Sequence, residues 1–171
     1  RSESELQEIL GVSDDLTQLN YERFQKWEKE HTAENAKPAL LLYAGQVYKM
    51  FEAADFSESE QARAQKSIRI ISGLYGLLRP YDLIQPYRLE MKTPLDYVGD
   101  QSLASFWSEN IPQALQEDID ESGAEAVINL ASNEYYNAID VEELSVPVID
   151  VDFKEERDGG LRTIAIYAKK A

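Results

Sequence analysis

Cysteine is absent from this chain of 171 residues, so disulfide bonds, thiolate zinc sites and cysteine nucleophiles are all excluded. The absence also fits a reducing compartment, and we expect a cytoplasmic protein. Histidine occurs once, at His31, which excludes a two-histidine metal site within these residues. No apolar run is long enough for a membrane span. We therefore expect no membrane association, no cofactor and no resident metal ion.

The length and the 43% content of apolar residues suit one globular domain covering residues 1–171. The chain begins at Arg1 without a methionine and stops at Ala171 directly after an apolar, strand-like run. We therefore expect a single domain that is truncated at both ends.

The first half of the chain has apolar residues at helical spacing. It predicts helices around residues 6–10, 16–27 and 35–51, and Ser57 with Glu60 predicts a capping box before a further helix that ends near residue 72. Asp100 predicts the N-cap of a later helix that carries Phe106 and Trp107. The second half favours strands, with a buried strand at 126–130 and a hairpin of 146–154 with 161–168. We expect a mixed α/β fold of the α+β kind, with a helical first half and strands mainly in the second half.

Charge is distributed unevenly along the chain. The formal net charge is -15, yet residues 61–92 contain six Lys or Arg and only two Asp or Glu, a local balance of +4. A basic segment in an acidic chain indicates an anionic partner, although a basic helix face can also be merely solvated.

The basic segment contains Ser72, Gly73, Leu74, Tyr75 and Gly76, in which two glycines bracket an apolar pair at an expected joint between helices. This pattern is typical of a helix-hairpin-helix, where free backbone N–H groups and the positive end of a helix dipole bind a phosphate. The alternative is structural: Gly73 is an ordinary helix C-cap and Gly76 an ordinary turn residue.

Four basic residues extend this predicted phosphate-binding surface, which is the DNA-binding surface if the anion is a nucleic acid. Arg79 and Arg88 flank the glycine pair together with tyrosines, a combination that suits phosphate forks and base stacking. Lys169 and Lys170 close the chain after an apolar run and extend the basic surface. The tyrosines are equally explained by packing at the domain surface.

A second group of polar residues follows the predicted strand at 126–130. Asn129, Ser132 and Glu134 lie where the carboxyl end of a strand opens into a ligand crevice in many α/β proteins, and we name them as a possible ligand pocket. Ser132 is also explained as a helix N-cap. Glu134 could act as a base or a metal ligand, and nothing beside it in the sequence specifies which.

Several motifs in order resemble the YaaA family of bacterial peroxide stress resistance proteins. They are SGLYGLLRPYDLIQPYRLEM, the pair FW, VINLASNEYY and the final YAKKA, and the resemblance extends to the helical region from Asn20 to Phe51. It implies a YaaA-like mixed α/β fold with a helix-hairpin-helix and a basic cleft. It also implies a cytosolic DNA-binding protein that protects cells from hydrogen peroxide by limiting free iron and its damage to DNA. Family members begin with a further strand and continue past the basic motif at the end of this chain.

The leading hypothesis is a peroxide-stress protein that contacts DNA through phosphates with little sequence preference, and is not an enzyme. The competing hypothesis is an enzyme acting on a small phosphorylated or nucleotide-like ligand held between Ser132, Glu134 and Arg88. A third is an interaction scaffold whose acidic residues 117–125 recruit basic partners.

Overall fold

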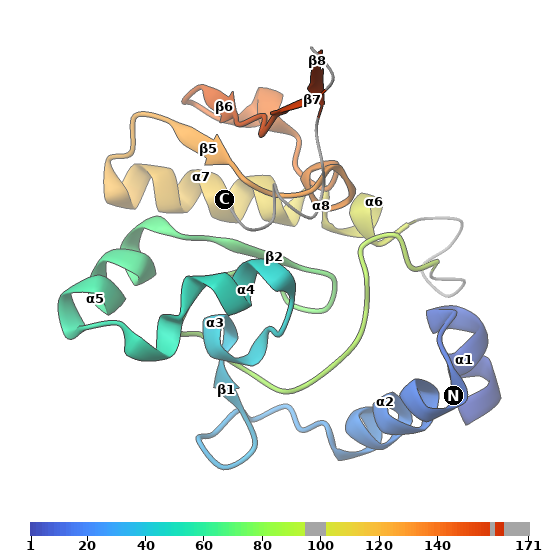
Figure 1. The fold of residues 1–171 in the computed structure, drawn as a ribbon. Helices are drawn as coiled ribbons and strands as arrows, with labels where there is room; N and C mark the ends of the chain where they lie inside the picture. The colour runs from blue at the N-terminus through green and yellow to red at the C-terminus, as the bar shows by residue number, and fades with distance from the viewer. Residues whose placement is uncertain (95–101, 158–159, 163–171) are drawn as a thin grey trace.

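A computed structural model describes residues 1–94, 102–157 and 160–162, and these form the mixed α/β fold that the sequence predicts (Figure 1). The α-helices are α1 (Glu3–Leu10), α2 (Asp14–Lys26), α3 (Ala39–Leu42), α4 (Gln46–Phe51), α5 (Glu58–Ser67), α6 (Leu103–Trp107), α7 (Asn110–Ser122) and α8 (Asn133–Tyr136). The strands are β1 (Lys37–Pro38), β2 (Ile70–Ser72), β3 (Gly76–Leu78), β4 (Leu83–Ile84), β5 (Val127–Asn129), β6 (Val148–Asp150), β7 (Glu155–Arg157) and β8 (Gly160–Arg162).

The helices of the first half agree with their local sequence signals in part. The capping box predicted before α5 is confirmed, because the Ser57 backbone N–H donates to Glu60 Oε2 at 2.8 Å and the helix begins directly afterwards. The helix ends at Ser67, however, and the chain continues as β2. The predicted long helix at 35–51 is divided into α3 and α4 at residues 43–45. Asp100, the predicted N-cap, lies outside the described residues, and Ser102 caps α6 through a bond from the Ser105 N–H.

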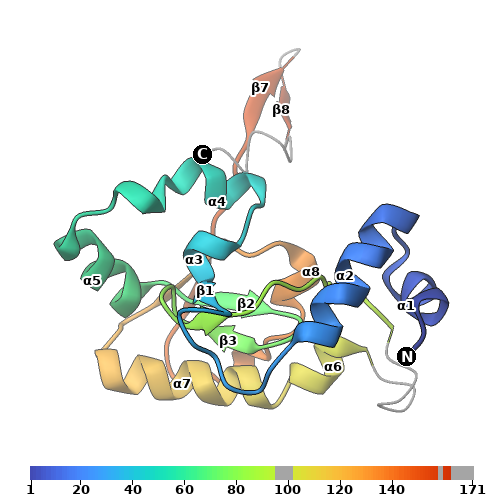
Figure 2. The ribbon, with the colours of Figure 1, turned by 90° about the horizontal axis from the view of Figure 1, so that it is seen from below.

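A two-stranded antiparallel hairpin of β2 and β3 occupies the centre of the described fold (Figure 2). Ile70 lies opposite Leu78, and Ile71 opposite Leu77. Because successive strand residues point to opposite faces, each face of the hairpin carries one apolar pair. The run of apolar residues on both sides of the two glycines thus produces a ribbon that is buried on both faces.

Each face of the hairpin packs on its own hydrophobic cluster. The pair of Ile70 and Leu78 joins a cluster with α3, in which Leu40 and Ile84 are buried. The pair of Ile71 and Leu77 packs against a second cluster, whose buried members are Met91, Leu103, Ile111 and Ala138. The hairpin therefore lies between two cores and connects them.

Helix α2 is held to the hairpin region by the side chain of Gln85, which is 4% exposed. Its amide nitrogen donates to the Glu28 carbonyl at 2.6 Å, and its amide oxygen accepts from the Glu28 N–H at 3.1 Å. This two-point contact fixes the backbone directly after α2. Three of the apolar side chains that give residues 16–27 their helical spacing are exposed, namely Leu16, Leu19 and Trp27.

We expect Gln85→Ala to loosen α2 while leaving α7 in place, because it removes both side-chain bonds to the Glu28 backbone. The expected cost is about 0.5–1.5 kcal/mol for each of the two bonds. Hydrogen exchange should show faster exchange of the α2 amides and unchanged exchange of the α7 amides. Gln61→Ala is the matched control, because Gln61 also bonds a carbonyl, that of Phe56, but at an exposed position. Equal effects of the two substitutions on α2 would contradict this role for Gln85.

The second half contains two strand pairings. At the end of the described chain β7 pairs antiparallel with β8, so a hairpin occurs there, but its first strand is 155–157 and not the predicted 146–154. The earlier residues assigned to that hairpin behave differently, because β6 pairs in parallel with β5. The strand at 127–129 is confirmed, but its predicted burial is wrong at Ile128, which is 61% exposed. Among the described helices, none has both the length and the apolarity to cross a bilayer.

Candidate functional site

The residues from Ser72 to Gly76 form the turn of the β2–β3 hairpin, so the predicted helix-hairpin-helix is wrong at this position. Ser72 is buried, and its Oγ accepts from the N–H groups of Leu74 at 3.3 Å and Tyr75 at 3.0 Å. These two amides are satisfied within the turn and are not free to bind a phosphate. The Ser72 hydroxyl therefore accepts the hydrogen bonds that the sequence pattern assigned to a bound phosphate.

The two glycines of the turn are required by close packing. A Cβ on Gly73 would lie 2.6 Å from the Leu89 carbonyl oxygen. Gly76 has φ +74°, and a Cβ there would lie 2.7 Å from the Trp107 ring. The Trp107 Nε1–H donates to the Gly73 carbonyl at 3.0 Å, which fixes the indole against the turn. Both glycines are therefore structural, as the alternative interpretation held. Gly76 is a turn residue as expected, but Gly73 follows β2 and is not a helix C-cap.

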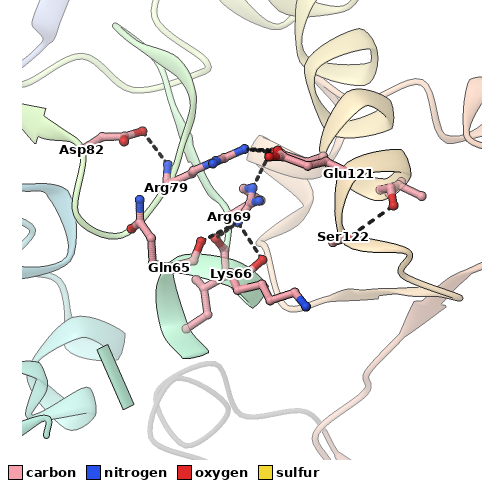
Figure 3. A network of polar contacts seen from close by, with 10 residues as sticks. Gln65, Lys66, Arg69, Arg79, Asp82, Glu121 and Ser122 are labelled. Atoms are coloured by element: carbon pink, nitrogen blue, oxygen red, sulfur yellow. Dashed lines mark hydrogen bonds and ion pairs between the residues drawn. The ribbon is translucent and has the colours of Figure 1, made fainter. Parts of the chain in front are cut away.

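Arg79, predicted to bind phosphate, is held in an ionic network between the hairpin and α7 (Figure 3). Its guanidinium bonds to Asp118 and, at 2.8 Å, to Glu121. Arg69 bonds to the same Asp118 through Nε and donates from its terminal nitrogen to backbone carbonyls, among them that of Ile68 at 2.7 Å. These bonds raise the pKa of Arg79, and the Arg69 and Arg79 guanidinium groups hold the pKa of Asp118 below its usual range. Arg79 is thus paired with two carboxylates of α7, and its side chain is 40% exposed.

A hollow of about 420 Å³ lies over this network. Its charged lining consists of Arg69, Arg79, Asp82, Glu117, Asp118 and Glu121, two cations against four carboxylates. Because the excess charge is negative, the hollow does not favour a phosphate.

Arg88 lies in a loop that the structure brings against α8. The Lys92 backbone N–H donates to Glu134 Oε1 at 3.2 Å, and the Lys92 Nζ lies 3.0 Å from Glu90 and 4.0 Å from Glu134. Arg88 bonds to Glu90 at 2.7 Å. The two segments predicted to form a ligand pocket therefore do meet. We name Arg88, Glu90, Lys92 and Glu134 the loop–α8 cluster.

The other predicted pocket residues have structural partners or positions. The Asn129 side chain donates to Asp150 at 2.8 Å, which links β5 to β6, and its oxygen accepts from the Ala131 N–H at 3.0 Å. Ser132 occupies the N-cap position of α8 with an exposed side chain that makes no capping bond. Lys169 and Lys170 lie outside the described residues.

A cluster of buried hydroxyl groups behind the turn was not predicted. Tyr87 Oη lies 2.6 Å from Ser72 Oγ and 2.7 Å from Tyr43 Oη. Because Ser72 Oγ already accepts two amides, its proton points to Tyr87, which in turn donates to Tyr43. Burial raises the pKa of both tyrosines, so each remains a neutral phenol at physiological pH. The only sequence signal was the pairing of tyrosines with glycines, and it gave no indication of Tyr43.

No group of three or more His, Asp or Glu side chains able to hold a metal ion occurs in the described part of the chain. The arrangement of charges instead favours ion pairing within the protein and leaves the outer cations of the loop–α8 cluster accessible. Arg88 and Lys92 have side chains that are 43% and 69% exposed.

Comparison with known proteins gives a consistent result over the whole chain. A family model described as "Peroxide stress protein YaaA" matches residues 1–171. A UPF0246 protein of Hahella chejuensis is 44% identical over 97% of this chain, and one of Idiomarina loihiensis is 42% identical over 99%. A UPF0246 protein of Flavobacterium johnsoniae is 44% identical over 98% of the chain. The chain spans 65% of the length of the first relative and 66% of each of the other two.

Proposed function

The chain belongs to the family of the peroxide stress protein YaaA, and from this membership we propose that its protein acts in the cytoplasm in defence against hydrogen peroxide. We propose further that it binds DNA and so helps to limit iron-dependent oxidative damage to it. Because the chain spans 65% to 66% of its relatives' length, these roles are proposed for the whole protein.

The observation that carries the proposed DNA contact is the exposure of Arg88 and Lys92 on one loop. Each pairs with Glu90, but their side chains remain 43% and 69% exposed. A guanidinium has five N–H donors and an ammonium three, so both retain donors for phosphate oxygens. The exposed Arg63 and Lys66 on α5 belong to the same basic stretch of sequence. Contacts of this kind read no base edges, which supports binding with little sequence preference.

The test is a salt titration of duplex DNA binding by the full-length protein. Each phosphate contact should contribute a slope of about -0.9 in log affinity against log salt. We expect Arg88→Ala and Lys92→Ala each to reduce the magnitude of the slope by about 1. Lys26→Ala on α2 is the matched control, because it removes the same charge from a 79% exposed side chain elsewhere. If all three substitutions weaken DNA binding equally, the effect is one of general charge and the assignment to this loop is wrong. If the full-length protein does not bind DNA, the proposal itself is wrong.

A second candidate function is action on a small phosphorylated or nucleotide-like ligand. The bond from the Lys92 N–H to Glu134 favours it, because it joins the two segments that would enclose such a ligand. Arg88 would pair with the phosphate, and the free hydroxyl of Ser132 would add a hydrogen bond. A nucleotide that raises the melting temperature of the wild type, but not of Arg88→Ala or Ser132→Ala, would favour this candidate over DNA binding.

A further inference from the structure

Aromatic side chains form a continuous series of contacts from the surface to the buried hydroxyl cluster. Trp27, at the end of α2, is 38% exposed. Its ring lies 5.8 Å from that of His31, which lies 5.6 Å from Tyr75. Tyr75 lies 5.4 Å from Tyr87, centroid to centroid in each case.

Trp27 and Tyr75, the first and third members of this series, are also joined directly by a hydrogen bond. The Trp27 Nε1–H donates to Tyr75 Oη at 3.1 Å. The Gln85 backbone N–H donates to the same oxygen at 3.2 Å, and the Gln85 side chain holds the backbone next to Trp27. The distance between the indole nitrogen and the phenol oxygen is thus fixed from both sides.

Indole and phenol are the side chains that a one-electron oxidant attacks most readily when thiols are absent, and this chain has no cysteine. The phenol O–H bond is weaker than the indole N–H bond, so an oxidised tryptophan takes a hydrogen atom from a nearby tyrosine. We propose that Trp27 and Tyr75 form a relay that moves oxidising equivalents from the protein surface to Tyr75.

Each step of the relay moves one electron together with one proton. An oxygen-centred radical such as the hydroxyl radical takes one electron and the Nε1 proton from Trp27 and leaves as water. The indolyl radical then takes one electron from Tyr75 and the proton of its hydroxyl, which re-forms the Trp27 N–H bond and leaves a phenoxyl radical on Tyr75. The Gln85 N–H still donates to the phenoxyl oxygen and holds it in place. A hydrogen atom from a small reductant of the ascorbate class restores the phenol.

The relay is independent of DNA binding, because none of its steps uses a nucleic acid. It adds an activity in which the protein itself accepts oxidising equivalents. The raised pKa of the neighbouring Tyr87 keeps that side chain a neutral phenol, so no buried phenolate forms next to the radical.

Pulse radiolysis with the azidyl radical, a selective one-electron oxidant of indole, tests the proposal on the full chain. We expect the optical absorption of the indolyl radical to decay as that of the phenoxyl radical grows. The rate should not depend on protein concentration and should fall in D₂O, because a proton moves with the electron. Tyr75→Phe, which keeps the ring and removes only the hydroxyl, should abolish this phase, and Trp27→Phe should abolish it as well.

Tyr136→Phe, on α8, is the matched control and should leave the phase unchanged. Circular dichroism of each variant establishes that the fold is retained. Survival of the phase in folded Tyr75→Phe, its survival in Trp27→Phe, or a rate proportional to protein concentration would each overturn the proposal.

Discussion

Gly76→Ala is expected to destabilise the protein by about 2–5 kcal/mol, because it combines backbone strain at positive φ with an overlap in a packed core. Gly76 has φ +74°, and the added Cβ would lie 2.7 Å from the Trp107 ring. The ring has little room to move, since its Nε1–H is bonded to the Gly73 carbonyl. Urea unfolding followed by circular dichroism measures the change.

Gly11→Ala separates the two contributions. Gly11 also has positive φ, +61°, but nothing lies within 4 Å of the position of its Cβ. This control should cost only the backbone strain, about 1–2 kcal/mol. If the two alanine variants unfold at the same urea concentration, the contact between Gly76 and Trp107 does not contribute, and the central position of the hairpin would need revision.

Asp118→Asn is expected to cost about 2–4 kcal/mol, because it leaves the largely buried Arg69 guanidinium without a counter-charge. Both side chains are only 14% exposed. Arg79 contributes less to this figure, since its side chain is 40% exposed and solvent screens its charge. Glu117→Gln is the control, because Glu117 is an exposed carboxylate on the same helix. A change at Asp118 no larger than the change at Glu117 would contradict a structural role for the network.

The ion pair of Asp118 with Arg69 also makes a pH-dependent contribution to the free energy of unfolding. The hydrogen bonds from Arg69 and then Arg79 lower the pKa of Asp118 from its ordinary 3.8. A carboxyl group whose pKa is lower in the folded state stabilises the fold fully above the unfolded pKa, and the contribution is lost as the pH falls through the folded value. Between pH 7 and pH 3, the free energy of unfolding of the wild type should therefore decline more than that of Asp118→Asn.

Local signals in the sequence were sufficient to predict structure where the residues that form a contact are close together in the chain. Ser57 and Glu60 predicted the start of α5 because both halves of a capping box are local. The fold class followed from periodicity for the same reason. The predicted end of α5 was wrong because the apolar run after the helix packs against a hydrophobic cluster on each face. Such a run has neither helical nor alternating spacing.

The candidate site was harder to predict because its partners are distant in sequence. Arg79 looked free in its own segment, and Asp118 and Glu121, which neutralise it, come from α7. Ser72 was assigned to a phosphate site, yet its hydroxyl satisfies the amides that the phosphate would bind. The meeting of the Arg88 loop with Glu134 was anticipated as a possible pocket, although the sequence did not indicate that a backbone N–H makes the contact.

Both tryptophans of the chain contact the same short turn. Trp27 bonds to Tyr75, and Trp107 bonds to the carbonyl of Gly73. Intrinsic fluorescence therefore reports on this turn rather than on the molecule as a whole. Set against the ellipticity of the helices, it gives a label-free way to see whether the centre of the protein melts together with its periphery.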